Sequence, residues 1–233
     1  MSIPRVAVLK FPGTNCDEDV VKSFKEVAPE VEAAVVWHKD FKSANDWDAV
    51  VIPGGFSYGD WLRAGAIAAR SEAVARLSEA VARGIPVLGI CNGFQILVEA
   101  GLLKGAFLLN EHGRFVCRWV RLRVERPRGP WLHLAEDGVE VHMPVAHGEG
   151  RYYVSSSEYE ELDSLHPIIR YLPGQNPNGS SYDIAGLGSR DGYVLGVMPH
   201  PERAATPMLT PRGFRPSGEL IFRSLSCSLK SGW

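Results

Sequence analysis

Short apolar runs alternate with helix-like segments along the first hundred residues of the chain. Residues 6–11, 33–37 and 48–53 are apolar runs with the length of a β-strand. Helices are predicted over residues 17–27 and over residues 69–82, where apolar side chains recur at helical spacing. Continuous apolar strands that alternate with helices are typical of a parallel sheet covered on both faces. The pattern therefore predicts an α/β fold with three layers and a mostly parallel central sheet.

Local signals set two helix boundaries. Asn15, followed three residues later by Glu18, has the form of a capping box. The turn over residues 12–15 is therefore expected to lead directly into the helix at Asp17. Gly84 lies where a C-cap is expected at the end of the second predicted helix.

The alternation changes after Leu103 to strand-like and loop-like pieces. Near the end of the chain, residues 182–187 and 193–198 are joined by a segment with glycine at its turn, which predicts a β-hairpin. The second strand of this hairpin leads into the sequence Pro-His-Pro-Glu at residues 199–202.

Arginines are concentrated between residues 114 and 128, close to Phe115 and Trp119, which superficially resembles a nucleic-acid-binding surface. Alternate residues such as Val120 and Leu122 are apolar, however, which favours a strand with one buried face and one solvated arginine face. The formal net charge of the chain is −2, so no nucleic-acid partner is expected.

The composition is that of an ordinary globular protein, with 233 residues, 45% of them hydrophobic and 22% charged. The length fits a single domain over residues 1–233. No apolar run is long enough to cross a bilayer, and the N-terminal residues lack the pattern of a targeting segment. We therefore expect a cytoplasmic protein with no membrane partner.

The four cysteines are far apart and form no Cys-x-x-Cys pair. A disulfide framework and a structural zinc site are therefore both disfavoured, and no metal site is expected. The cysteines are Cys16, Cys91, Cys117 and Cys227.

Cys91 lies in the sequence Gly-Ile-Cys-Asn-Gly, after an apolar run and before a helix-like segment. This is the pattern of a nucleophile elbow, in which the reactive side chain lies at the carboxyl end of a strand and needs small neighbours. Gly89 and Gly93 are those neighbours. The N-terminus of the following helix favours the thiolate of Cys91 over the thiol. The common alternative for a cysteine in a strand is an inert core position.

A thiol nucleophile needs a base, and the base needs a group that fixes its tautomer. His200 and Glu202 fit these two roles, because side chains two residues apart on an extended segment lie on the same side. His147 is the second candidate for the base. An exposed turn is the alternative interpretation of residues 199–202.

Backbone N–H groups near Cys91 could stabilise negative charge on a carbonyl oxygen. One donor is expected from Asn92, and another from the turn of Gly54, Gly55 and Phe56. The phosphate-loop and dinucleotide-binding glycine patterns are both missing. The candidate site therefore predicts acyl transfer through a thioester, with an ester, an amide or a peptide as substrate.

The chain resembles the class I glutamine amidotransferases, in which a Cys-His-Glu triad releases ammonia from glutamine. Cys91, Gln95 and the pair His200 and Glu202 carry this resemblance. Longer segments resemble the glutaminase subunits of this family that serve purine biosynthesis. These segments are residues 11–17, 54–60, 62–65, 176–180 and 198–203.

The resemblance implies that Cys91 is the nucleophile, His200 the base and Glu202 the orienting carboxylate. It places Gln95 beside the glutamine substrate and makes Arg114 and Phe115 a further wall of the pocket; a helix-surface position is the alternative for Gln95. Cys16 is expected to pack structurally at the start of a helix, with a second catalytic thiol as the alternative.

The resemblance also implies a larger synthase partner that uses ATP and Mg²⁺ to activate formylglycinamide ribonucleotide, and a small accessory subunit. This chain itself is expected to bind no cofactor. The segments 207–216 and 228–233 depart from the family pattern. Two other functions stay open at this point, namely a stand-alone cysteine hydrolase or peptidase and a non-catalytic glutamine-sensing module.

Overall fold

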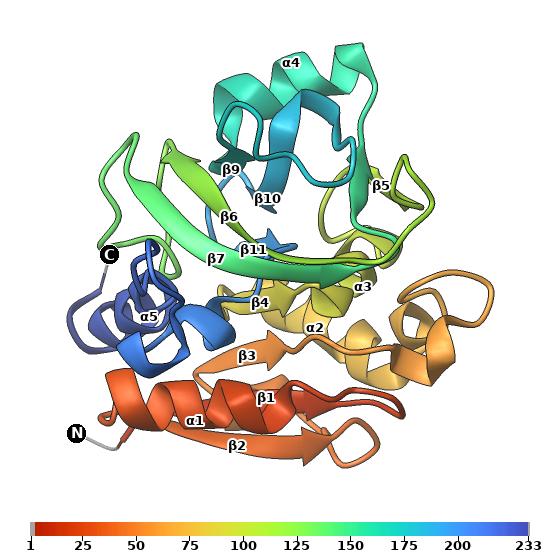
Figure 1. Cartoon of the computed structure of the whole chain (residues 1–233). Coiled ribbons are helices and arrows are strands. Elements are labelled where there is room, and N and C mark those ends of the chain that lie inside the picture. Colours follow the sequence, from red (N-terminus) through yellow and green to blue (C-terminus); the bar gives the residue numbers. More distant parts are fainter. Residues whose placement is uncertain (1–2, 233) are drawn as a thin grey trace.

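A mixed β-sheet with helices on both faces forms the centre of the protein, for which we describe residues 3–232 of a computed structural model (Figure 1). Within those residues the main sheet has nine strands in the order β2-β1-β3-β4-β11-β10-β9-β6-β7, and β5 and β8 form a separate pair. The strands are β1 (Arg5–Lys10), β2 (Glu32–Trp37), β3 (Ala49–Ile52), β4 (Val87–Ile90), β5 (Ala106–Leu108), β6 (Val116–Glu125), β7 (Glu140–His147), β8 (Arg151–Tyr153), β9 (Ile168–Tyr171), β10 (Ile184–Gly188) and β11 (Val194–Val197).

The helices cover the parallel part of this sheet and extend over its antiparallel end (Figure 1). The α-helices are α1 (Asp17–Val27), α2 (Glu72–Ala82), α3 (Asn92–Glu99), α4 (Ser156–Leu165) and α5 (Glu219–Ser231). Short 3₁₀ helices are η1 (Ala44–Asp46), η2 (Ser57–Asp60), η3 (Ala68–Arg70), η4 (Ser181–Asp183), η5 (Pro201–Ala204) and η6 (Pro207–Leu209).

The sheet has a parallel part and an antiparallel part that meet at β11. Strands β2, β1, β3, β4 and β11 pair in parallel, whereas β11, β10, β9, β6 and β7 pair antiparallel. All residues of β3 and β4 are buried, as expected for central parallel strands with helices on both faces. The predicted α/β fold is confirmed, and β10 and β11 form the predicted hairpin.

The arginine-rich segment is strand β6, with one buried face. Val120, Leu122 and Val124 are buried, and the arginines between them are exposed. This confirms the strand predicted from the alternation.

The start of α1 was predicted correctly, but the capping box was wrong. The N-cap is Cys16, whose side chain makes no capping bond, and Oδ1 of Asn15 accepts from the thiol of Cys16 instead. The N–H groups of Asn15 and Cys16 both donate to the carbonyl of Gly54. The turn before α1 is therefore fixed by the loop that follows β3, and not by a local cap.

The second predicted helix begins later than expected. Ser71 caps α2 by accepting a hydrogen bond from the N–H of Val74, so residues 68–70 form the separate turn η3. At the other end the C-cap is Arg83, and Gly84 follows it with φ +79°. Gly84 therefore occupies the left-handed position just after the cap.

The pattern of apolar positions did not identify α4 or α5. Helix α4 begins with a capping box between Ser155 and Glu158, a signal that is visible in the sequence. Helix α5 packs against α1, where the rings of Phe24 and Phe222 meet edge to face at 5.0 Å. No helix among residues 3–232 has the length and apolar character needed to cross a membrane.

Candidate active site

Cys91 occupies a strained turn between β4 and α3. Its φ of 50° and ψ of −103° are unusual for a residue with a side chain, and it is 5% exposed. A Cβ on Gly93 would lie 1.9 Å from the carbonyl oxygen of Ile52, and one on Gly89 would lie 2.5 Å from Leu97. The close contact of β3, β4 and α3 therefore requires both glycines, as a nucleophile elbow predicts.

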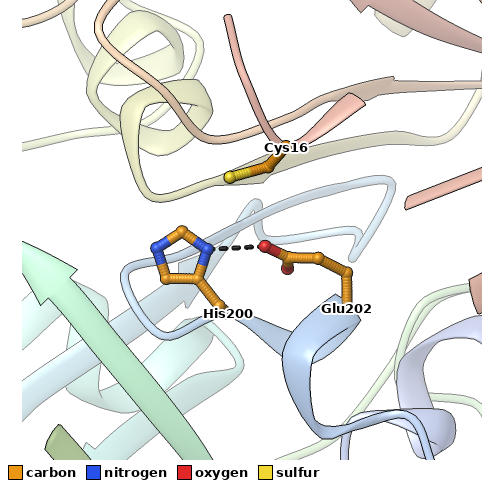
Figure 2. A group of neighbouring side chains, drawn as sticks. All are labelled: Cys16, His200 and Glu202. Atoms are coloured by element: carbon orange, nitrogen blue, oxygen red, sulfur yellow. Dashed lines mark hydrogen bonds and ion pairs between the residues drawn. The ribbon is translucent and has the colours of Figure 1, made fainter. Parts of the chain in front are cut away.

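His200 and Glu202 form a buried hydrogen-bonded pair. Nδ1 of His200 lies 2.6 Å from Oε1 of Glu202, and the dashed line in Figure 2 marks this hydrogen bond. The two side chains are 2% and 0% exposed. An extended segment was expected here, but only His200 is extended, and the 3₁₀ helix η5 begins at Pro201. The N–H of His200 donates to the carbonyl of Pro144, which fixes this turn beside β7.

Cys91 and the imidazole of His200 both lie close to Gly54. A Cβ on Gly54 would lie 2.8 Å from Cε1 of His200 and 3.5 Å from Cβ of Cys91. The sulfur of Cys91 donates to the carbonyl of Ala146 at 3.7 Å. Residues 109 positions apart in the chain therefore converge at the carboxyl ends of β3 and β4, where parallel sheets place their ligands.

His200 can carry a positive charge despite its burial. Burial lowers the pKa of His200, but the negative charges of Glu202 and Cys91 and the nearby sulfur of Cys16 raise that pKa well above 6.5. Nε2 of His200 is buried and has no hydrogen-bond partner among the described residues. This nitrogen is therefore free to exchange a proton with the Cys91 thiol or with a substrate.

Cys16 contributes a second sulfur to this centre (Figure 2). Its Sγ, a ring nitrogen of His200 and a carboxylate oxygen of Glu202 all lie within 4.8 Å of one another. These donor types could hold a thiophilic metal ion. However, the 2.6 Å hydrogen bond joins two of them, and the guanidinium of Arg203 donates to Cys16 Sγ at 3.1 Å. These donors already interact with their neighbours, so we assign no ion to them.

His147, the second candidate for the base, has both ring nitrogens occupied. Nδ1 lies 3.1 Å from Oδ1 of Asn110, and Nε2 lies 3.3 Å from Nδ2 of Asn178. Burial and the charge of His200 lower the pKa of His147 to about 4. These amides hold His147 as a neutral ring that is not free to accept a proton, so the geometry favours His200 as the base.

A cavity of about 170 Å³ opens beside Cys91. Of the predicted binding residues, Gly55, Phe56, Gln95 and Phe115 line it. Gln95 is 4% exposed, so the interpretation of Gln95 as a helix-surface residue is wrong.

Three predicted binding residues do not line this cavity. The structure leaves the side chain of Arg114 exposed. Gly54 lies against the imidazole ring of His200 instead. The Asn92 side chain is buried. Its Oδ1 accepts a hydrogen bond from the N–H of Ser57, and its Nδ2 donates to Oε1 of Gln95. These bonds fix the position of Gln95 in the cavity wall.

Two carboxylates that the sequence reasoning missed, Asp60 and Glu149, also line the cavity. Burial and the charge of Glu149 raise the pKa of Asp60 to about 6. Oε2 of Glu149 accepts from the N–H of Ala64, and its carbonyl accepts from Nε2 of Gln95. Asp60 lies in the segment 54–60, which resembles the family, and Glu149 lies two residues after His147. No pattern in the sequence indicates that these two carboxylates face each other.

The predicted oxyanion donors are only partly available. The N–H of Phe56 donates to the carbonyl of Gly13, so it does not face the cavity as a free donor. Gly55 has φ +146° and pairs with Thr14 in an isolated β-bridge. The hydrogen bonds of this bridge are donated by the N–H groups of the residues that follow Thr14 and Gly55, and not by the N–H of Gly55. The backbone donors that remain are Gly55 and Asn92, the latter at the N-terminus of α3.

Residues 3–217 match the CobB/CobQ-like glutamine amidotransferase domain family. The chain is 51% identical over 209 residues to the phosphoribosylformylglycinamidine synthase subunit PurQ of Pyrobaculum aerophilum, covering 90% of this chain and 92% of that protein. It is 48% identical over 208 residues to PurQ of Pyrococcus furiosus, covering 86% and 89%.

Solved structures agree with these matches. The PurLQS structure from Thermotoga maritima superposes with a TM-score of 0.84 at 38% identity, covering 98% of this chain and all of the matched chain. The glutaminase domain of Trypanosoma brucei CTPS, with bound acivicin, gives a TM-score of 0.59 at 16% identity over 97% and 94% of the two chains, which supports the fold alone. The resemblance found in the sequence is confirmed: the chain belongs to the CobB/CobQ-like glutamine amidotransferase family and, within it, to the PurQ subunits of phosphoribosylformylglycinamidine synthase.

Proposed function

We propose that Cys91, His200 and Glu202 hydrolyse glutamine to glutamate and ammonia, and that the ammonia passes to a synthase that converts formylglycinamide ribonucleotide to its amidine. The observation that carries this proposal is the convergence of the elbow thiol, the imidazole and the carboxylate at the carboxyl ends of β3 and β4. Membership in the PurQ family supports the choice of glutamine and of purine biosynthesis.

In the first half of the reaction, the sulfur of Cys91 attacks the side-chain amide carbon of glutamine. His200 takes the thiol proton at Nε2 and transfers it to the departing nitrogen, while Glu202 accepts the Nδ1–H bond and stabilises the imidazolium. The N–H groups of Gly55 and Asn92 face the developing oxyanion. Ammonia leaves, and a thioester remains on Cys91.

In the second half, water hydrolyses the thioester. His200 takes a proton from the attacking water and returns it to the Cys91 sulfur as the carbon–sulfur bond breaks. The balance is one glutamine and one water in, and one glutamate and one ammonia out.

The shape of the cavity favours an amino acid over a peptide. Its volume of about 170 Å³ suits a small substrate. Its walls come from segments on both sides of the thiol, namely residues 55–60 and 146–149. A stand-alone peptidase would need an open groove for an extended chain, so this alternative has weaker support.

Large exposed apolar side chains on and beside the cavity wall support a protein partner. Phe56, Leu109 and Phe115 line the cavity and are 46%, 64% and 55% exposed. Trp61 and Leu62, a few residues after Phe56 in the chain, are 74% and 92% exposed. Exposed apolar side chains of this size mark interaction surfaces. We assign this exposed apolar surface to the large synthase subunit, with a small accessory subunit in the same complex, as the composition of the Thermotoga PurLQS assembly suggests. ATP and Mg²⁺ belong to the synthase subunit in this proposal.

Replacement of Cys91 by alanine in the reconstituted complex tests the proposal. Synthesis of the amidine from glutamine is expected to stop, whereas synthesis from added ammonium continues, because the variant removes only the nucleophile. Loss of both activities in a correctly assembled complex would contradict the assignment.

The non-catalytic alternative is tested with a glutamine-like electrophile. The proposal expects covalent labelling of Cys91 in the complex, detected by peptide mass spectrometry, and no labelling of the C91A variant. A complex that binds glutamine but leaves Cys91 unlabelled would instead support a glutamine-sensing module.

A further inference from the structure

Resting on the proposed glutaminase function, we propose that Cys16 is a positioning residue of the catalytic centre. Its sulfur, anchored by Arg203, fixes the His200 ring in the orientation that directs Nε2 toward Cys91. The sequence suggested only structural packing or a second catalytic thiol for Cys16.

The contacts of the Cys16 sulfur give it a defined orientation. Its thiol donates to Oδ1 of Asn15 at 3.2 Å, and the guanidinium of Arg203 donates to the sulfur at 3.1 Å. Cys16 is 1% exposed, so water does not compete for these bonds. With its proton directed to Asn15, the sulfur acts as an acceptor for Arg203 and lies within 4.8 Å of a ring nitrogen of His200.

The ring of His200 needs such a second contact. Its hydrogen bond to Glu202 fixes one nitrogen, but rotation about that bond would move Nε2 away from Cys91. Gly54 leaves the space that allows both groups to approach, since a Cβ there would lie 2.8 Å from Cε1 of His200 and 3.3 Å from Cys16 Sγ. The sulfur lies within 4.8 Å of a ring nitrogen of His200, a position from which it limits rotation of the ring and stabilises an imidazolium.

The charged and titratable groups around His200 come from four parts of the fold. They are Glu202 and Arg203 on η5, Cys91 at the elbow, Cys16 before α1 and His147 on β7. Arg203 also lies 3.8 Å from Oε1 of Glu202. One guanidinium therefore links Cys16 to the carboxylate that orients His200.

The test compares Cys16→Ser with Cys16→Val in a background that carries Cys117→Ser and Cys227→Ser. Serine keeps a small acceptor for Arg203, whereas valine fills the space without one. The rate at which iodoacetamide alkylates Cys91 is measured against pH, with the modified residue identified by mass spectrometry.

For the valine variant we expect the rate of Cys91 alkylation at neutral pH to fall about tenfold and the pH profile to change, because a His200 ring that has turned away no longer favours the thiolate. The serine variant is expected to stay within about threefold of the background chain. A valine variant with an unchanged profile, or a serine variant that falls equally far, would overturn the proposal. If the valine variant does not fold, Cys16→Ala replaces it with the same two outcomes.

Val20→Ala is the matched control for a general loss of packing. Val20 is fully buried on α1, one turn beyond Cys16, so its truncation lowers stability without removing a contact to the ring. We expect this control to keep the background pH profile, and a shifted profile would also overturn the proposal. The alkylation assay uses neither glutamine nor the synthase, so its outcome is independent of the Cys91→Ala test of function.

Discussion

Nδ1 of His200 and Oε1 of Glu202 lie 2.6 Å apart, and both side chains are almost completely buried. The pair belongs to one short turn after β11, and neither residue is part of the elbow. The parallel sheet then supplies Cys91 and Gly54 from two other strand ends. The proposed catalytic centre thus combines a hydrogen-bonded pair held on one turn with a thiol from a separate strand end.

This pair predicts the effect of Glu202→Gln. The amide oxygen can still accept a hydrogen bond from Nδ1–H of His200, but the amide has no negative charge to stabilise the imidazolium. The kcat for glutamine hydrolysis is therefore expected to fall about 10²- to 10³-fold. Steady-state kinetics of the complex measures this effect. The loss should be smaller than that of Cys91→Ala, and an equal loss in a folded variant would show that Glu202 does more than orient and stabilise.

His147 predicts a loss of stability in acid. Its pKa is about 4 in the folded chain and near 6.5 when unfolded, so protons bind the unfolded state more tightly. The stabilisation is complete above pH 6.5 and is lost as the pH falls toward 4. Urea unfolding should show a drop of about 3 kcal/mol over this interval from this group alone. In the His147→Gln variant this pH-dependent loss of unfolding free energy should be missing, and Cys91 should still be labelled at neutral pH. Loss of Cys91 labelling in this variant would instead support His147 as the base.

Asp60 predicts a variant that is more stable than the natural chain. Its folded pKa of about 6 exceeds the unfolded value of 3.8, so its contribution to stability is full below 3.8 and is lost as the pH rises through 6. Asp60→Asn removes the buried charge and should raise the unfolding free energy by about 1 kcal/mol at neutral pH, after allowance for solvent screening. The gain should vanish near pH 4, and a gain that is constant with pH would contradict this cause.

Gly93 predicts a severe folding defect. A methyl group there would lie 1.9 Å from the carbonyl oxygen of Ile52, and neither backbone can shift without moving β3 or α3. Gly93→Ala is expected to cost about 3 kcal/mol or more in unfolding free energy. Gly148→Ala is the control, because its nearest atom would be 3.8 Å away on the Phe115 side chain. Similar melting temperatures for the two variants would disagree with this contact.

The sequence was most informative where one physical requirement dominates. Buried parallel strands must be apolar along their whole length, so β1, β3 and β4 were visible as runs. The elbow was visible because the close packing of β3, β4 and α3 leaves no room for a Cβ at positions 89 and 93. The dyad was visible because His200 and Glu202 are two residues apart.

The features that escaped prediction depend on distant partners. The capping box at Asn15 competes with bonds to Gly54, more than thirty residues away, and the distant bonds are the ones that form. Asp60 interacts with Glu149, and Cys16 contacts Arg203. The residues of each pair are far apart in the chain, so no periodic pattern in the sequence indicates either interaction.

The segment from Phe56 to Leu62 has an inner and an outer surface. Its backbone adopts left-handed conformations at Tyr58, Asp60 and Leu62, and its exposed side chains face solvent while Asp60 lines the cavity. A protein that contacts Trp61 or Leu62 would therefore contact the same stretch of backbone that forms part of the cavity wall. In the proposed complex we expect assembly to influence hydrolysis through this one loop, without any signal having to cross the sheet.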